Sequence, residues 1–186
     1  MDFALADINL SNFAGKRSLI RGEVKTGKTI LVSRLVFQFM AEGYSGLVVM
    51  DLAPEVLHGV GGKMPLPPPT GGLRVISPWI AAPRLSGGSP QEVERLAQAN
   101  GAVIDQVLTD YQAAPGQVLF INDVSLYLQS REPEALLTVL AATPTVVMNG
   151  YQGFSLGRDD FSKREARRME RLAAFCDLVI DLPLKT

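Results

Sequence analysis

Short apolar runs recur along the chain, each bounded by glycine, proline or polar residues. The runs are RSLIRG (17–22), GLVVMD (46–51), LRVIS (73–77), QVLFIND (117–123), PTVVMNG (144–150) and DLVIDL (177–182). Their apolar residues are continuous rather than alternating with polar ones, which is the pattern of strands buried on both faces. The pattern therefore predicts the strands of a parallel sheet.

Longer segments with a helical period lie between these runs. In KTILVSRLVFQFMAEG (28–43), Leu31, Leu35 and Phe39 fall on one helical face. Further helices are predicted at 90–112, at 133–142 and at 159–175. Strands that alternate with helices in this way predict an α/β fold, a three-layer sandwich with a mainly parallel central sheet.

One region shows neither the continuous apolar runs of the strands nor the helical period. PEVLHGVGGKMPLPPPTGG (54–72) and APRLSGGSP (82–90) are rich in proline and glycine. Irregular loops of this length are uncommon in compact domains and are usually functional. The chain has 186 residues, the length of one domain. We therefore expect a single domain, 1–186, with an irregular insert near 54–90.

Composition and charge exclude some classes of protein. The net charge is −1 and 47% of the residues are hydrophobic, which is ordinary for a globular protein, so nucleic-acid binding is not supported. The N-terminal MDFALADINLSNFAGKR has two aspartates before its first basic residue, unlike a signal peptide. No apolar run reaches the length of about 18 residues that a transmembrane helix needs. We expect a cytoplasmic protein with no membrane partner.

The string GEVKTGKT (22–29) lies between the first predicted strand and the first predicted helix. Glycine, four residues, then Gly-Lys-Thr is the spacing of a phosphate-binding loop. Backbone N–H groups of such a loop surround a phosphate, and the helix that follows directs its positive end at the anion. The loop predicts a nucleotide-binding site made of Gly22, Glu23, Val24, Lys25, Thr26, Gly27, Lys28, Thr29 and Ile30.

A magnesium nucleotide site also needs a carboxylate at the end of a neighbouring buried strand. VLFIND (118–123) ends in Asp123, which we predict to hold Mg²⁺ together with the Thr29 hydroxyl. Asp51, which closes GLVVMD, is a competing carboxylate. Both strands would end at the same edge of the sheet as the loop, where ligands bind in open α/β folds.

With these motifs the chain resembles the P-loop NTPase superfamily, with GEVKTGKT as Walker A and VLFIND as a Walker B candidate. The resemblance implies that Lys28 contacts phosphates and that Asp123 orients the metal's water shell. Val124 stands where AAA-type members have a glutamate that activates water. RecA-like members often carry that glutamate after the next strand, which implies Asp51 or Glu55 here, and Asn149 is similar to their sensor residue.

Four further features leave alternatives open. Lys25 lacks the flanking glycines of the deviant Walker A of the ParA and MinD group, so it is either a solvated lysine or a contact to a phosphate or an anionic second substrate. Glu23 is a third candidate base or a solvated side chain. Arg158 is a candidate lid residue or arginine finger. The basic helix 158–171 and the 54–90 loops are candidate surfaces for a homo-oligomer or a protein partner.

The motifs together predict Mg²⁺-dependent binding and hydrolysis of a nucleoside triphosphate, ATP or less favourably GTP, since no guanine-specific NKxD string occurs. One alternative is a P-loop transferase, either a small-molecule kinase or a cobalamin-type adenosyltransferase, in which the insert would bind the acceptor. Another is a slow nucleotide-gated interaction protein.

Overall fold

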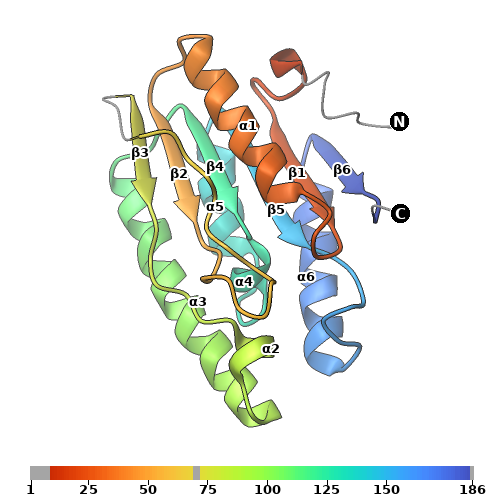
Figure 1. Cartoon of the computed structure of the whole chain (residues 1–186). Coiled ribbons are helices and arrows are strands. Elements are labelled where there is room, and N and C mark those ends of the chain that lie inside the picture. The colour runs from red at the N-terminus through yellow and green to blue at the C-terminus, as the bar shows by residue number, and fades with distance from the viewer. Residues whose placement is uncertain (1–8, 69–71, 185–186) are drawn as a thin grey trace.

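The central element is a six-stranded sheet in the part of the chain that the computed structural model describes, residues 9–68 and 72–184 (Figure 1). Its strands are β1 (Arg17–Gly22), β2 (Leu47–Asp51), β3 (Leu73–Ile76), β4 (Val118–Asn122), β5 (Thr145–Tyr151) and β6 (Leu178–Leu182). Every pairing is parallel, and the order across the sheet is β3-β2-β4-β5-β1-β6. The predicted parallel sheet is confirmed.

Helices cover both faces of this sheet. Helix α1 (Lys28–Ala41) packs on one face, together with the short 3₁₀ turn η1 (Leu10–Asn12), and lies in front of the sheet in Figure 1. The opposite face carries α3 (Pro90–Ala113), α4 (Ser125–Leu128), α5 (Glu134–Ala142) and α6 (Asp160–Phe175). Helix α2 (Pro83–Ser86) packs against α3. The α/β three-layer sandwich is thus as predicted.

The two hydrophobic cores divide the side chains of each strand between them. In β2, Val48 and Met50 belong to the core beneath α3, whereas Leu47 and Val49 belong to the core beneath α1. Successive strand side chains point to opposite faces, so a strand covered on both sides must be apolar at every position. This geometry explains why the strands were recognisable as continuous apolar runs.

Three short elements were not predicted: η1, α2 and α4. The first eight residues of the N-terminal segment considered for a signal peptide lie outside the described residues, as do residues 69–71 of the insert. The remainder of the insert contains β3 and α2, with an isolated antiparallel bridge between Leu57 and Val60. The division into one domain with an insert stays a prediction.

Among the described residues, no helix combines the length and the apolar character needed to cross a bilayer.

Parallel strands bring their carboxyl ends to one edge of the sheet, and three polar residues gather there. Asp51 ends β2 and is the register partner of Asn122, which ends β4. Asn149 lies near the end of β5, the strand between β4 and β1. All three side chains are buried, with at most 2% of their surface exposed. The candidate site is built around this edge.

Candidate functional site: a phosphate-binding loop and a polar network

The loop between β1 and α1 depends on glycine at two positions. Gly22 has a φ of 152°, and a Cβ there would lie 2.6 Å from the backbone oxygen of Leu182 in β6. Gly27 has a φ of 94° and is the N-cap of α1. It offers no side chain to cap the helix, so the first-turn N–H groups remain available to an anion. Both glycines are therefore required by the backbone of this loop, and its binding of phosphate stays a prediction.

Lys28 extends back across this loop. Its Nζ donates to the backbone oxygen of Gly22 at 2.9 Å and to that of Glu23 at 2.5 Å. Burial lowers the pKa of Lys28 below its ordinary value, and the negative charges of Asp123 and Glu23 act in the opposite direction. The ammonium group is therefore held in place over the loop.

Thr29 is linked to the strand ends through a chain of amides. Its hydroxyl donates to Asn122 Oδ1 at 3.1 Å, and Asn149 Nδ2 donates to the same oxygen at 2.9 Å. Asn122 Nδ2 donates in turn to Asp51 Oδ1 at 2.7 Å. The network joins β2, β4 and β5 to the first turn of α1.

Asp123 leaves the strand at this point, with a φ of 63° that turns the chain away from the direction of β4. Its backbone N–H donates to Asn149 Oδ1 at 2.9 Å, and its carboxylate accepts from the Ser125 hydroxyl. Burial raises the pKa of Asp123, against the opposing effects of the Ser125 hydrogen bond and the charge of Lys28. The sequence paired Asp123 with Thr29 at a metal, but the residue that accepts the Thr29 hydroxyl is Asn122. The metal-binding role of Asp123 stays a prediction.

The two residues predicted to activate water, Asp51 and Glu55, differ in burial: Asp51 is buried and Glu55 is exposed. Both carboxylate oxygens of Asp51 are engaged, one by Asn122 and the other by the Met64 N–H at 2.7 Å. Glu55 is exposed on the insert. Neither is among the described residues that line the cavity next to the loop, whereas Asp123 is. The roles of Asp51 and Glu55 in polarising water stay predictions.

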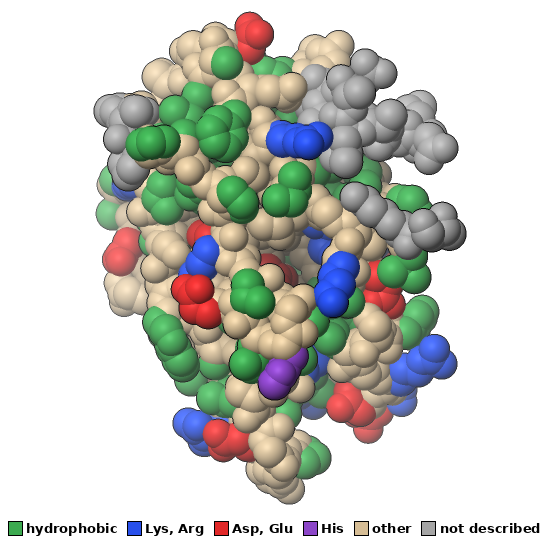
Figure 2. Space-filling model, in the orientation of Figure 1, with side chains coloured by type: hydrophobic (Ala, Val, Ile, Leu, Met, Phe, Trp, Pro, Cys, Tyr) green, Lys and Arg blue, Asp and Glu red, His purple; other side chains and the backbone are tan. Residues whose placement is uncertain are grey.

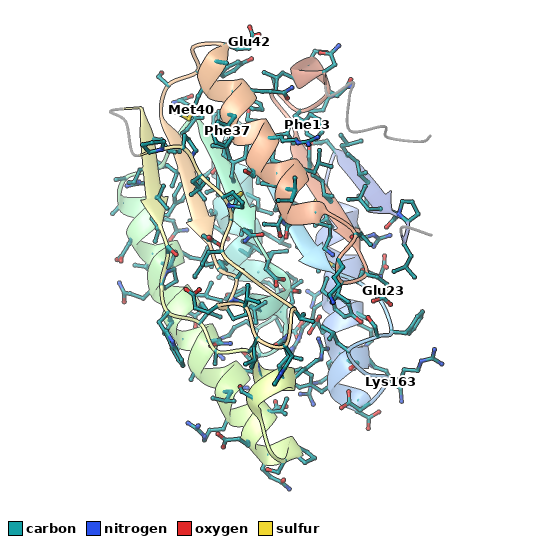
Figure 3. All side chains as sticks on the ribbon, viewed as in Figure 1. Phe13, Glu23, Phe37, Met40, Glu42 and Lys163 are labelled. Atoms are coloured by element: carbon teal, nitrogen blue, oxygen red, sulfur yellow. The ribbon has the colours of Figure 1, made fainter. Side chains whose placement is uncertain are left out.

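Glu23 fastens the phosphate loop to the segment between β5 and α6. Its carboxylate accepts from the backbone N–H of Phe154 at 2.5 Å and that of Ser155 at 3.2 Å, and from the Ser155 hydroxyl. Figure 3 labels Glu23 at the loop end nearest that segment. Burial acts to raise the pKa of Glu23, but these donors outweigh it and leave the pKa below its ordinary value. The carboxylate is thus committed to holding the loop.

The other loop residues lie around the opening of a cavity. Val24, Lys25, Gly27 and Ile30 line it, and Thr26 is buried with its hydroxyl donating to the Glu23 backbone oxygen. Lys25 adopts a φ of 61°, and its Nζ approaches Gly59 of the insert. The choice between a solvated Lys25 and a ligand contact stays open, since the side chain is near both the loop and the insert.

The cavity measures about 550 Å³ and extends from the phosphate loop to the insert, α2 and α4. Figure 2 shows this face of the molecule hollowed, with basic side chains beside the hollow. Described residues that line it outside the loop include Lys63, Arg84, Asp123, Ser125, Gln129 and Asn149. The Lys63 ammonium is held by the backbone oxygens of Asp51 and Pro78, at 3.1 and 3.0 Å.

Arg84 is a cavity residue that no sequence pattern predicts, because it lies in an aperiodic proline-bounded stretch. It forms a buried ion pair with Glu165 of α6 at 2.9 Å and lies over the rings of Tyr151 and Phe161. Arg158, the predicted lid residue, lies 5.0 Å from the centre of the Phe154 ring and is not among the described cavity residues. Asn122 and Gln129 were also missed.

The basic helix is extensively paired within the chain. Arg164 binds Glu94, Arg168 binds Glu132, and Arg171 binds Glu132 and Glu134. These ion pairs hold α6 against α3 and α5 and engage three of the six basic side chains in 158–171. Recruitment of a partner by this helix or by the insert stays a prediction.

The residues present suit Mg²⁺ held jointly with a ligand's phosphates. Among the described residues, no group of three or more His, Cys, Asp and Glu side chains forms a metal cage. Mg²⁺ commonly uses one or two protein ligands together with phosphate oxygens and water. The Thr29 hydroxyl gives its proton to Asn122, so its oxygen lone pairs are free, and Asp123 adds a carboxylate to the same cavity.

Among the comparisons with known proteins, only that with solved structures finds a match. No family model matches the chain, and no curated protein matches it in sequence. Among solved structures, it is similar to the flagellar accessory protein FlaH from Methanocaldococcus jannaschii, with a TM-score of 0.54 and 13% sequence identity. The match covers 91% of this chain and 71% of that one. The likeness shows an α/β fold that the two chains share.

Proposed function

We propose that the protein binds a nucleoside triphosphate, ATP in preference to GTP, with Mg²⁺, and hydrolyses it. The observation that carries the proposal is the phosphate loop itself: Lys28 is fixed by the oxygens of Gly22 and Glu23 beside an uncapped helix N-terminus. A triphosphate placed there meets backbone donors, the positive end of α1 and the Lys28 ammonium together.

Within this proposal each residue has a distinct task. Lys28 and the loop amides hold the β- and γ-phosphates and stabilise the charge that develops on the transferred phosphoryl group. Thr29 and Asp123 would hold Mg²⁺, which neutralises phosphate charge when bound. Asn149 orients the Asp123 backbone through its side-chain oxygen.

Water activation requires a carboxylate with access to the γ-phosphate. We propose Asp51 and Glu55, the candidates from the sequence, for this role, because the Asp123 carboxylate in the cavity is assigned to Mg²⁺. Glu55 is exposed on the insert, between the cavity residues Pro54 and Val56, and is the first residue to test, by Glu55→Gln.

The test is Lys28→Ala, with Lys163→Ala as the matched control. Lys163 is exposed on α6 and pairs only with Asp160 among the described residues, so its loss removes a lysine without touching the loop. We expect Lys28→Ala to weaken binding of Mg²⁺–ATPγS at least about 100-fold by calorimetry, the loss of two or more charge-assisted contacts. Binding that is equal in Lys28→Ala and the wild type would disprove the proposal.

A second candidate, group transfer to an acceptor, is favoured by the extent of the cavity. Beyond the phosphate loop it continues between α2 and α4, where Arg84, Ser125, Leu126 and Gln129 line it. The buried Gln129 Oε1 has no hydrogen-bond partner among the described residues and would accept from a ligand. Phosphate release from ATP alone, compared with turnover that needs an added hydroxyl or amine compound, separates the two functions.

A further inference from the structure

In the hydrogen-bond network that links Thr29 to Asp51, Asp51 determines which group donates and which accepts. An ionised carboxylate only accepts hydrogen bonds, and the two oxygens of Asp51 receive the Met64 N–H and the Asn122 amide, each at 2.7 Å. The Asn122 NH₂ group must therefore face Asp51. Its oxygen then faces α1.

The other end fixes the same direction independently. The Asp123 backbone N–H only donates, and it donates to Asn149 Oδ1 at 2.9 Å. The Asn149 NH₂ group must then face Asn122, whose oxygen accepts it at 2.9 Å. Both ends require the Asn122 oxygen to be the acceptor for the Thr29 hydroxyl.

We propose that Asp51 is a positioning residue that acts on Thr29 through Asn122, so that two residues on adjacent strands together orient the Thr29 hydroxyl. The inference rests on the proposed nucleotide function. Asp51 orients the Asn122 amide and polarises it through a short charge-assisted bond, which strengthens the amide oxygen as an acceptor. Thr29 is thereby held with its lone pairs directed away from the sheet.

The placement of the two residues explains why one of them is an amide. Asp51 and Asn122 are register partners on adjacent strands, and both side chains are buried. Two carboxylates in this contact would repel each other without solvent to screen them. One carboxylate and one amide satisfy the network, and exchanging them satisfies it as well.

Exchanging the two residues tests whether Asp51 and Asn122 act through their hydrogen bonds, as a relay to Thr29, or only fill space in the core. In Asp51→Asn, a single amide oxygen must serve two donors, from Met64 and Asn122. In Asn122→Asp, two carboxylates face each other. In the double variant Asp51→Asn/Asn122→Asp, every donor again meets an acceptor: the Thr29 and Asn149 donors meet a carboxylate, and the Met64 N–H meets the new amide oxygen.

The first measurement is thermal unfolding of the ligand-free full chain at pH 7.5. We expect each single variant to lower Tm by about 5 °C or more, the scale of a buried unsatisfied polar group in a chain of this size. The double variant should recover more than half of the summed loss. If the Tm losses of the two single variants simply add in the double variant, or if the double variant does not fold, the relay is overturned. If a single variant does not fold but the double variant does, the relay is supported.

The second measurement is the ratio of the ATPγS Kd in EDTA to that in Mg²⁺, which a purely structural role would leave unchanged. We expect Asp51→Asn to reduce this ratio at least about fivefold and the double variant to restore it. An unaltered ratio in Asp51→Asn would overturn the positioning role. Absence of ATPγS binding by the wild type would instead overturn the proposed function, and the Tm comparison would still decide whether the network is coupled.

Discussion

At the scale of the residue, Glu165 is the least expected charge in the molecule. It lies on α6 with 2% of its surface exposed, paired with Arg84. Burial raises its pKa to about 7, although the charge of Arg84 acts to lower it. A carboxyl group with this pKa changes its charge near neutral pH, next to a residue that lines the cavity.

The raised pKa makes stability depend on pH with a definite sign. Because the folded-state pKa lies above the unfolded value, the contribution of Glu165 is fully present below pH 4.5 and is lost as pH rises to about 7. We predict that the unfolding free energy of the wild type, relative to Glu165→Gln, falls by about 3 kcal/mol between pH 4.5 and pH 8. Urea unfolding of both proteins at the two pH values measures this difference. A constant difference would show that Glu165 keeps an ordinary pKa.

Residue-scale roles were the hardest to derive from sequence. VLFIND offers an asparagine and an aspartate in succession, and the composition of the string favours the aspartate as the partner of Thr29. The outcome depends on where β4 stops: Asn122 is its last residue, and Asp123 turns away with a positive φ. A strand pattern does not specify that turn. The prediction of a phosphate-binding loop at 22–29, by contrast, rests on a fixed local spacing and uses no tertiary information.

At the scale of the element, the contacts of α6 separate arginines that look alike in the sequence. Arg168 is largely buried, binds Glu132 and donates to the backbone oxygens of Leu128 and Gln129 at 2.9 and 3.1 Å. It thereby satisfies carbonyl groups at the end of α4. Arg171 is half exposed and binds only carboxylates among the described residues.

These contacts predict different costs for the same substitution. Arg168→Ala leaves carbonyl groups of α4 without a partner and should lower the unfolding free energy by about 2 kcal/mol. Arg171→Ala removes a solvent-screened pair and should cost less than about 1 kcal/mol. Chemical unfolding of both variants at one ionic strength makes the comparison. Equal losses would mean that α6 is held by its charges alone and that its link to α4 contributes nothing.

The long helices and the strands were predictable because a single period persists over each of them. The strand Leu47–Asp51 and the helix Pro90–Ala113 lie within a few residues of the segments expected from the sequence. The four-residue helices α2 and α4 are too short to display a helical period. They nonetheless supply Arg84, Ser125 and Leu126 to the cavity, and Gln129, the C-cap of α4, lines it as well. The part of the site built on short elements was therefore hidden from periodicity.

At the scale of the whole molecule, the cavity unites segments that are far apart in the chain. The phosphate loop forms one wall of the cavity, and residues of the segment 53–65 form another. Lys63 and Met64 of this segment hydrogen-bond to the end of β2. Both contacts lead to Asp51, which also connects to Thr29 through Asn122. The insert is thus bonded to the same strand end that supports the phosphate loop. Proline and glycine content predicted an irregular loop but could not predict where that loop would settle.

This arrangement predicts how the molecule responds to nucleotide as a unit. A triphosphate in the cavity touches the loop, and the shared contacts at Asp51 should slow local opening of the insert as well. We expect saturating Mg²⁺–ATPγS to slow hydrogen exchange at least about tenfold at the amides of 22–29, of 53–65 and of 82–85, because all three segments line the cavity. Helix α5 contributes no described residue to the cavity and serves as the internal control, where exchange should not change. Lys28→Ala should abolish the protection everywhere. Protection confined to 22–29 would show that the insert and α2 do not enclose the nucleotide.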